Sequence, residues 1–423
     1  MDEQRTSETL WRRCRGDLVA GLTTAVLLIP QSMAYAALAG LPPIVGLYAS
    51  LVPLLAYAAL GSSRQLTVGP VAIVSLMTAH VLAGHAHLGP ERLIMLAALL
   101  AAMVGLIQLL MAAMRPAVLV RLIAPPVLMG FVSAMAILTM STQLDDLLGL
   151  EIAGTTRPHE VLLGVVAALP QTHVWTALIA GVALVILVGL SKLRPAFPSA
   201  LVVVILGSLA AWALGGESRG IATVGELASG LPSIVFFWPD AADVGALFMG
   251  AVAIAFVSFL QSIASATIFA NRHGYTLSPV RELLGLAGAN LVGSLFQAFP
   301  VAGSFSRTAV NDAAGARTRW AAVVTALSVA LTLLFITSFF FYLPLSILAA
   351  IIAVAVARLI NISGWLGYFR RDPGALVVAL ITFAVTLVVG VEIGITVGVA
   401  ASLIRQRATR HASETDPAPV CLS

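Results

Sequence analysis

Long apolar runs separated by short polar connections dominate the pattern of this chain. A membrane-spanning helix needs about 20 consecutive apolar residues, and most of the runs between residues 17 and 406 approach or exceed that length. Residues 145–171 and 215–240 are polar or amphipathic connections instead. The pattern predicts an all-α polytopic membrane protein with fourteen segments, at 17–38, 44–61, 69–83, 91–114, 118–144, 172–191, 196–214, 241–271, 280–297, 304–314, 317–341, 343–360, 374–389 and 391–406.

The composition excludes a soluble protein and fits a chain surrounded by a lipid bilayer. Apolar types make up 60% of the 423 residues and charged types 10%, whereas a soluble domain carries about a quarter charged residues. The net charge of +4 comes from basic residues scattered in short loops, which is typical of membrane orientation rather than of nucleic-acid binding.

No motif predicts a catalytic centre, a cofactor or a metal site. The two cysteines, Cys14 and Cys421, lie near opposite ends of the chain and predict neither a disulfide framework nor a zinc site. His85 and His87 lack a third ligand. The sequence GSFSR does not have the pattern of a nucleophile elbow, so we do not expect an enzyme.

The distribution of arginine and lysine predicts the orientation. When the amino terminus is placed in the cytoplasm and the chain crosses at every segment, 19 of the 23 basic residues fall on the cytoplasmic side. Arg92, Arg157 and Arg219 fall outside, and Arg307 is the one basic residue that is assigned to neither side. Residues 1–16 then form a cytoplasmic segment, and both termini are cytoplasmic.

Two short segments predict an inverted repeat. Residues 66–78 (LTVGPVAIVSLMT) and 300–310 (PVAGSFSRTAV) each begin with small or β-branched residues and a glycine before the helical pattern starts. A non-helical start at membrane depth is tolerated only where protein or a cavity covers it. Each segment is the third of seven in its half. Because seven is an odd number of crossings, the two halves have opposite topology in the membrane. Broken segments at matching positions are typical of a transport site.

The two broken segments predict an anion site near the middle of the membrane. Their helix amino termini face each other in this topology, and each offers unpaired N–H groups and about half a positive charge. Arg307 adds a full charge, which costs about 2.5–3.5 kcal/mol within a membrane and therefore calls for a partner. Ser304 and Ser306 supply hydroxyl groups, and Gly303 permits close approach of the backbone.

Two simpler explanations of Arg307 are open at this point. The side chain could snorkel to the membrane surface from a helix end, or Asp312 could neutralise it. Asp312 lies five residues further on and so is not squarely on the helical face of Arg307. We therefore expect Asp312 near Arg317 and Arg319.

Two long stretches resemble the signatures of a known family. Residues 17–76, which begin DLVAGLTTAVLLIPQSMAYAALAGLPP, and residues 281–321, which contain FPVAGSFSRTAVNDAAGARTRWA, are similar to those of the SulP anion transporters, solute carrier family 26. The resemblance implies a bacterial member in the inner membrane, with fourteen segments in a seven-plus-seven inverted repeat of the UraA-like fold. It implies a first repeat of 17–144 with 172–214, a second repeat of 241–406, a core domain of 17–114 with 241–341 and a gate domain of 118–214 with 343–406.

The resemblance also implies which residues bind the anion. Gln31 and Tyr35 are one helical turn apart and could instead bond a neighbouring helix, and Phe305 could be ordinary packing. The implied pocket lies between the first, third, eighth and tenth segments, with Gln31, Tyr35, Gly69, Pro70, Ala72, Gly303, Ser304, Phe305, Ser306 and Arg307 as its anion-binding residues.

The chain departs from the family pattern at two places. Gln261 stands where many members have a carboxylate for cation coupling, and glutamine cannot titrate. Coupling to H⁺ or Na⁺ therefore stays open, with Gln261, Ser262 and Ser265 as candidate ligands, although such serines more often join helices. Residues 407–423 form a short cytoplasmic tail where members usually carry a STAS regulatory domain, so we expect that domain to be absent.

These observations predict a secondary carrier of small anions that works by an elevator-like movement of the core against the gate. Carboxylates or dicarboxylates, bicarbonate and sulfate all fit one arginine and a ring of N–H donors. Cation-coupled symport and a homodimer are further expectations. An anion channel or voltage-responsive motor of the same family is an alternative, as is a nucleobase carrier of the same fold. Arg307 argues against the nucleobase carrier, because such a site should prefer carboxylates.

Overall fold

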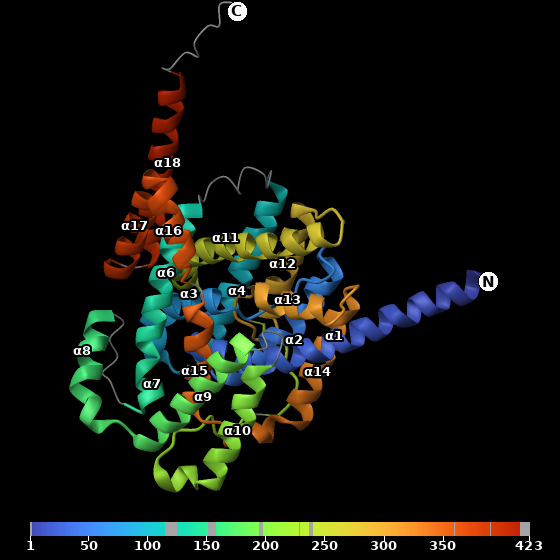
Figure 1. Cartoon of the computed structure of the whole chain (residues 1–423), viewed down its shortest axis with the longest axis vertical. Helices are drawn as coiled ribbons and strands as arrows, with labels where there is room; N and C mark the ends of the chain where they lie inside the picture. The colour runs from blue at the N-terminus through green and yellow to red at the C-terminus, as the bar shows by residue number, and fades with distance from the viewer. Residues whose placement is uncertain are drawn as a thin grey trace, which may run out of the picture.

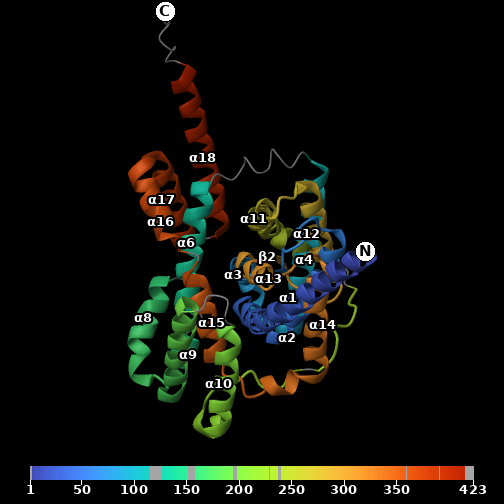
Figure 2. The ribbon, with the colours of Figure 1, turned by 45° about the vertical axis from the view of Figure 1, so that its right-hand side comes forward.

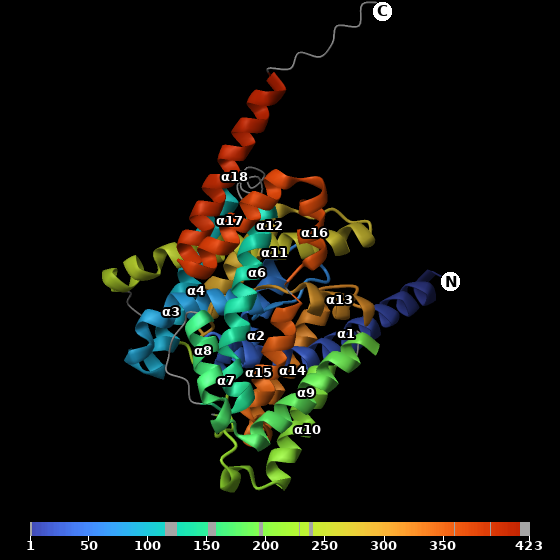
Figure 3. The same cartoon turned by 60° about the vertical axis from the view of Figure 1, so that its left-hand side comes forward.

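The fold is almost entirely helical. The computed structural model describes residues 2–114, 125–150, 158–193, 198–227, 229–236, 240–358, 360–389 and 391–414. Within these ranges the only strands are two of two residues each. The helices pack into one body, from which the amino-terminal end of α1 (Asp2–Leu38) and the carboxyl-terminal end of α18 (Val391–Glu414) project (Figures 1 and 3).

The order of the elements follows the predicted segments through both halves and confirms the predicted fold class. The first half continues after α1 with α2 (Pro43–Leu60), β1 (Val68–Gly69), α3 (Ala72–Leu82), α4 (Pro90–Ala113), α6 (Pro125–Thr142), α9 (Val174–Leu193) and α10 (Ser199–Ala213). The second half contains, before α18, α11 (Ala241–Arg272), α12 (Pro279–Ser294), β2 (Ala302–Gly303), α13 (Phe305–Ala313), α14 (Trp320–Phe335), α15 (Leu345–Ala357) and α17 (Pro373–Val388). Among the described residues, seven helical stretches are long and apolar enough to cross a membrane by themselves.

The ends and connections differ in part from the prediction. Residues 2–16 extend α1 and residues 407–414 extend α18, whereas 118–124 and 415–423 lie outside the described residues. Short helices follow the fifth segment of each half. They are α7 (Leu144–Leu148) and α8 (Pro158–Ala168) in the first half and α16 (Ile362–Arg371) in the second. Short stretches of 3₁₀-helix occur at Ala83–Leu88, Leu169–Gln171, Gly216–Arg219 and Thr337–Phe340.

Two paired strands lie at the centre of the fold. β1 leads into α3 and β2 leads into α13, and the strands pair antiparallel, with Val68 opposite Gly303 and Gly69 opposite Ala302. Extended backbone inside a membrane protein has no water with which to bond, so its polar groups must be satisfied by the protein. The pairing does this, and it places the beginnings of the two half-helices side by side.

Buried amides support the strands from behind. The Asn290 side chain accepts a hydrogen bond from the Val301 N–H at 2.9 Å and donates to Gln108 Oε1 at 3.0 Å. Gln108 in turn donates from Nε2 to Ser258 Oγ at 2.8 Å. These contacts join α4, α11 and α12 to the residue that precedes β2. Polar side chains buried this completely stabilise a fold only when their bonds are complete.

The helices form two groups, which Figure 2 shows side by side. The strand group consists of α1–α4 and α11–α14, which pack around β1 and β2. The flanking group consists of α6 with α17 and α18, and of α9 with α10 and α15. α1 contacts α10 and α15 across the boundary, and α3 contacts α6 and α15.

Replacing Asn290 with alanine is expected to lower the melting temperature of the purified protein by several degrees. The substitution leaves the Val301 N–H and Gln108 Oε1 buried without their partner, and each such loss costs about 1–3 kcal/mol. Asn271→Ala is the matched control, because it removes an exposed amide near the end of α11. Equal melting temperatures for the two variants would contradict a structural role of Asn290.

Candidate functional site

A cavity of about 340 Å³ lies between the two helix groups. α1, α3, α11 and α13 contribute to it from the strand group, and α9, α10 and α15 contribute from the flanking group. The cavity brings together most of the residues singled out from the sequence, namely Gln31, Tyr35, Ala72, Gln261, Ser304, Phe305, Ser306 and Arg307.

The amino-terminal ends of both half-helices lie at this cavity. Val71 and Ala72 line it at the beginning of α3, where no side chain caps the helix. Ser304 lines it at the beginning of α13 and accepts a hydrogen bond from the Arg307 backbone N–H at 3.4 Å. First-turn N–H groups lack partners within their own helix and amount to about half a positive charge. Both helix ends therefore turn positive potential toward the cavity.

Arg307 is a buried cation in the wall of the cavity. Only 1% of the residue is exposed, and its Nε and Nη2 have no hydrogen-bond partner among the described residues. A side chain buried to this degree does not snorkel to the membrane surface, so the first simpler explanation of Arg307 is wrong. Two donors of a buried cation are thus left without a partner among the described residues.

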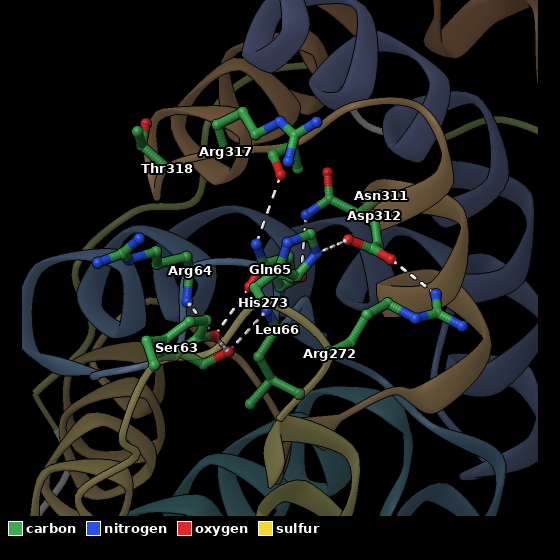
Figure 4. A network of polar contacts seen from close by, with 12 residues as sticks. Ser63, Arg64, Gln65, Leu66, Arg272, His273, Asn311, Asp312, Arg317 and Thr318 are labelled. Atoms are coloured by element: carbon green, nitrogen blue, oxygen red, sulfur yellow. Dashed lines mark hydrogen bonds and ion pairs between the residues drawn. The ribbon is translucent and has the colours of Figure 1, made fainter. Parts of the chain in front are cut away.

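Asp312 does not neutralise Arg307, so the second explanation is wrong as well. The Asp312 carboxylate accepts hydrogen bonds from Arg272 Nη1 at 2.9 Å and from His273 Nε2 at 2.5 Å (Figure 4). Both partners come from the end of α11, and among the described residues Asp312 forms no ion pair with Arg317 or Arg319. The contact ties the carboxyl-terminal ends of α11 and α13 together.

A buried carboxylate fixes the loop before β1. Glu282 in the first turn of α12 is fully buried. It accepts hydrogen bonds from the Tyr57 hydroxyl at 2.6 Å, the Ser62 hydroxyl at 2.7 Å, and the Ser62 and Ser63 backbone N–H groups at 2.9 Å each. All its donors among the described residues are neutral, and together they hold Ser62 and Ser63 against α12.

The other cavity residues offer both polar and apolar contacts. Gln31 and Gln261 have side-chain oxygens that are buried without a hydrogen-bond partner. Gln31 is therefore not engaged through that oxygen with a neighbouring helix. Phe305 is 50% exposed, and its ring lies 5.7 Å from the ring of Phe269 between centroids. It contacts another ring and also lines the cavity.

Five of the predicted residues do not line the cavity. Gly69 lies next to the Arg307 side chain, which is in the wall of the cavity. A Cβ atom at Gly69 would be 3.5 Å from Nη2 of Arg307. A Cβ atom on Gly303 would instead meet the Leu66 side chain at 2.9 Å, so that glycine permits close packing against the segment before β1. The remaining three are Pro70, Ser262 and Ser265.

The candidate cation ligands are mostly engaged with the protein. Ser265 Oγ donates to the Gln261 carbonyl at 2.9 Å, and Ser262 Oγ accepts from the Gly303 N–H at 2.8 Å. Ser262 thus supports β2. Across the described ranges, no three His, Cys, Asp or Glu side chains come together as a metal ion would require.

The flanking group contributes polar residues that the sequence did not single out. Arg358, directly after α15, lines the cavity and is exposed, and Ser191 and Ser199 line it from α9 and α10. By the distribution of basic residues, Arg358 is one of the 19 predicted on the cytoplasmic side, like most arginines of the chain. No local signal separates it from them, because only the packing of α15 against α1 brings it to the cavity.

The chain is similar to transporters over most of its length. The sequence model of the sulfate permease family matches residues 14–382. The chain is 38% identical over 357 residues to the chloroplastic sulfate transporter 4.1 of Arabidopsis thaliana, covering 82% of this chain and 51% of that protein. It is 37% identical over 373 residues to a probable sulfate transporter of Mycobacterium tuberculosis, covering 88% and 66%. Against human solute carrier family 26 member 6 the identity is 31%, covering 87% and 51%.

Solved structures share the fold. The murine solute carrier 26 family member A9 anion transporter, in the inward-facing state, superposes with a TM-score of 0.86 at 24% identity, covering 93% of this chain and 68% of that chain. The transmembrane domain of the cyanobacterial bicarbonate transporter BicA gives a TM-score of 0.77 at 21% identity, covering 92% and 97%. The chain thus has a transporter fold and spans about half to two thirds of the length of the curated relatives described above.

Replacing Glu282 with alanine is expected to destabilise the loop before β1 and to lower the melting temperature. The substitution removes the acceptor of four hydrogen bonds, and bonds to a charged group contribute about 1.5–3 kcal/mol each. Glu91→Ala, at an exposed position in the first turn of α4, should change the melting temperature little. A Glu282 variant as stable as the Glu91 variant would refute the role of this carboxylate.

Proposed function

Because the chain belongs to the sulfate permease family, we propose that it carries small anions across the membrane. The observation that supports this most directly is the buried Arg307, which lines the cavity reached by the amino termini of α3 and α13 and whose Nε and Nη2 lack a hydrogen-bond partner among the described residues. A buried charge without a counter-ion is unfavourable in a membrane protein. A small anion in the cavity would balance it.

The free edge of the guanidinium favours an oxyanion. Nε and Nη2 lie on the same edge of the planar group, so their N–H bonds can meet two oxygens of one anion at the same time. Carboxylates, bicarbonate and sulfate present such a pair of oxygens, whereas a halide presents a single acceptor. The names of the relatives describe sulfate and bicarbonate transporters, which agrees with this choice.

The position of the cavity favours an elevator-like mechanism. Arg307 and both helix amino termini belong to the strand group, and the opposite wall belongs to the flanking group. We propose that the strand group is the mobile core (17–114 and 241–341) and that the flanking group is the gate (118–214 and 343–406). A movement of the core would then carry the anion past the gate without dismantling its site.

Coupling to a cation is the least supported part of the proposal. None of the described residues that line the cavity is an Asp or Glu, so H⁺ coupling would need an acid elsewhere. For symport with Na⁺, Gln261 offers an unpartnered oxygen, whereas Ser265 lies outside the cavity. Residence in a bacterial inner membrane with cytoplasmic termini, and assembly as a homodimer, belong to the same proposal.

Replacing Arg307 with alanine should reduce anion uptake into proteoliposomes by more than about tenfold, because loss of about 1.4 kcal/mol of binding already gives that factor. The assay would use labelled sulfate, bicarbonate and dicarboxylates, with and without H⁺ and Na⁺ gradients. Arg317→Ala is the matched control, since it removes an exposed arginine just beyond α13. If Arg307→Ala took up every anion as fast as Arg317→Ala does, Arg307 would have no role in anion transport. Trans-stimulation by internal anion would separate a carrier from a channel.

Arg358→Ala is expected to raise the KM for the anion more than it lowers kcat. The exposed Arg358 attracts anions to the cavity from the flanking wall, and attraction by exposed charges weakens as salt screens it. The effect should therefore be largest at low ionic strength and should be restored in part by Arg358→Lys. An unchanged KM at low salt would show that Arg358 takes no part.

A further inference from the structure

A second cavity, of about 590 Å³, lies between α6 and α16 and shares no residue with the anion cavity. The wall formed by α6 is apolar and includes Leu128, Met129 and Val132. The wall formed by α16 is polar and includes Tyr368 and Arg371. The same cavity is therefore lined by an apolar surface on one side and by the Arg371 guanidinium on the other.

α16 has the character of a helix that lies along a membrane surface. Ile362, Leu366 and Phe369 recur on one face and are 68%, 49% and 68% exposed. On another side, Trp365 Nε1 donates to Ser133 Oγ of α6 at 3.0 Å, which fixes the helix against the body. A short amphipathic helix with an unpartnered apolar face and basic residues at one end is typical of the boundary between headgroups and acyl chains.

The positive charge in this cavity is free to act on a ligand. Asp372 also lines the cavity, but its carboxylate accepts bonds from Arg405 Nη2 at 2.6 and 2.9 Å and from the Ala375 N–H at 3.0 Å. The Ala375 N–H and the Arg405 charge hold the pKa of Asp372 below its ordinary value. No carboxylate among the described residues forms an ion pair with Arg371.

We propose that the cavity between α6 and α16 binds an anionic phospholipid. The phosphate would contact the Arg371 guanidinium, whose fork of donors matches phosphate oxygens. The upper part of an acyl chain would pack on the apolar wall of α6, and the rest would stay in the bilayer. A bound lipid would fix α16, which connects α15 to α17, and so steady the part of the flanking group that ends at Arg358 beside the anion cavity.

The test uses the full chain, stripped of lipid in detergent. Bound lipid is measured by native mass spectrometry and by the rise in melting temperature on adding phosphatidylglycerol, phosphatidylcholine or free glycerol 3-phosphate. The variants are Arg371→Ala, Arg371→Lys and the matched control Arg370→Ala, which removes the adjacent arginine outside the cavity. Both arginines are exposed, so melting without lipid should be the same in every variant.

We expect phosphatidylglycerol to bind and stabilise the wild type and Arg370→Ala, and apparent affinity to fall at least about tenfold in Arg371→Ala, with partial recovery in Arg371→Lys. Equal binding by Arg371→Ala and Arg370→Ala would overturn the proposal. Equal stabilisation by phosphatidylcholine and phosphatidylglycerol would also overturn it, because the site would then not distinguish an anionic lipid from one without net charge. Stabilisation by glycerol 3-phosphate equal to that by the lipid would also overturn it and indicate a site for a free phosphate.

Discussion

Every part of this fold that bears on function depends on one requirement. Backbone that leaves the helical conformation inside a membrane protein must still have its N–H and C=O groups bonded. β1 and β2 meet the requirement by pairing with each other, and Asn290 and Ser262 satisfy N–H groups at and just before β2. Since the strands lead into α3 and α13, the same bonds that satisfy the backbone hold two positive helix ends at one cavity.

Arg307 strengthens a potential that the backbone has already created. Its guanidinium is buried, and its nearest acidic residue along the chain, Asp312, is engaged by Arg272 and His273. The cavity therefore combines one full positive charge with two partial ones and has no carboxylate among its described lining residues. Such an arrangement disfavours cations, and it favours a small anion over a neutral solute of the same size.

The helices were predictable because their signals are local. Apolar runs gave all fourteen segments, and the glycine in each broken segment marked the two half-helices. Arg307 stood out because a charge within an apolar stretch is visible in the sequence itself. Arg358, Glu282 and the partners of Asp312 could not be found in that way. Arginine in a loop or glutamate near a helix end is ordinary, and these residues gain their roles only when helices far apart in sequence pack together. α16 was missed because its ten residues are too few to span a membrane.

The attachment of α13 to α11 at both ends has a consequence for selectivity. At one end the Gly303 N–H is bonded to Ser262, and at the other Asp312 holds Arg272 and His273. The donors that face an arriving solute are thus preorganised during folding, and the half-helix has little freedom to adjust to a poor fit. Discrimination between anions would then come from how well their size and shape match a rigid template, with little contribution from induced fit.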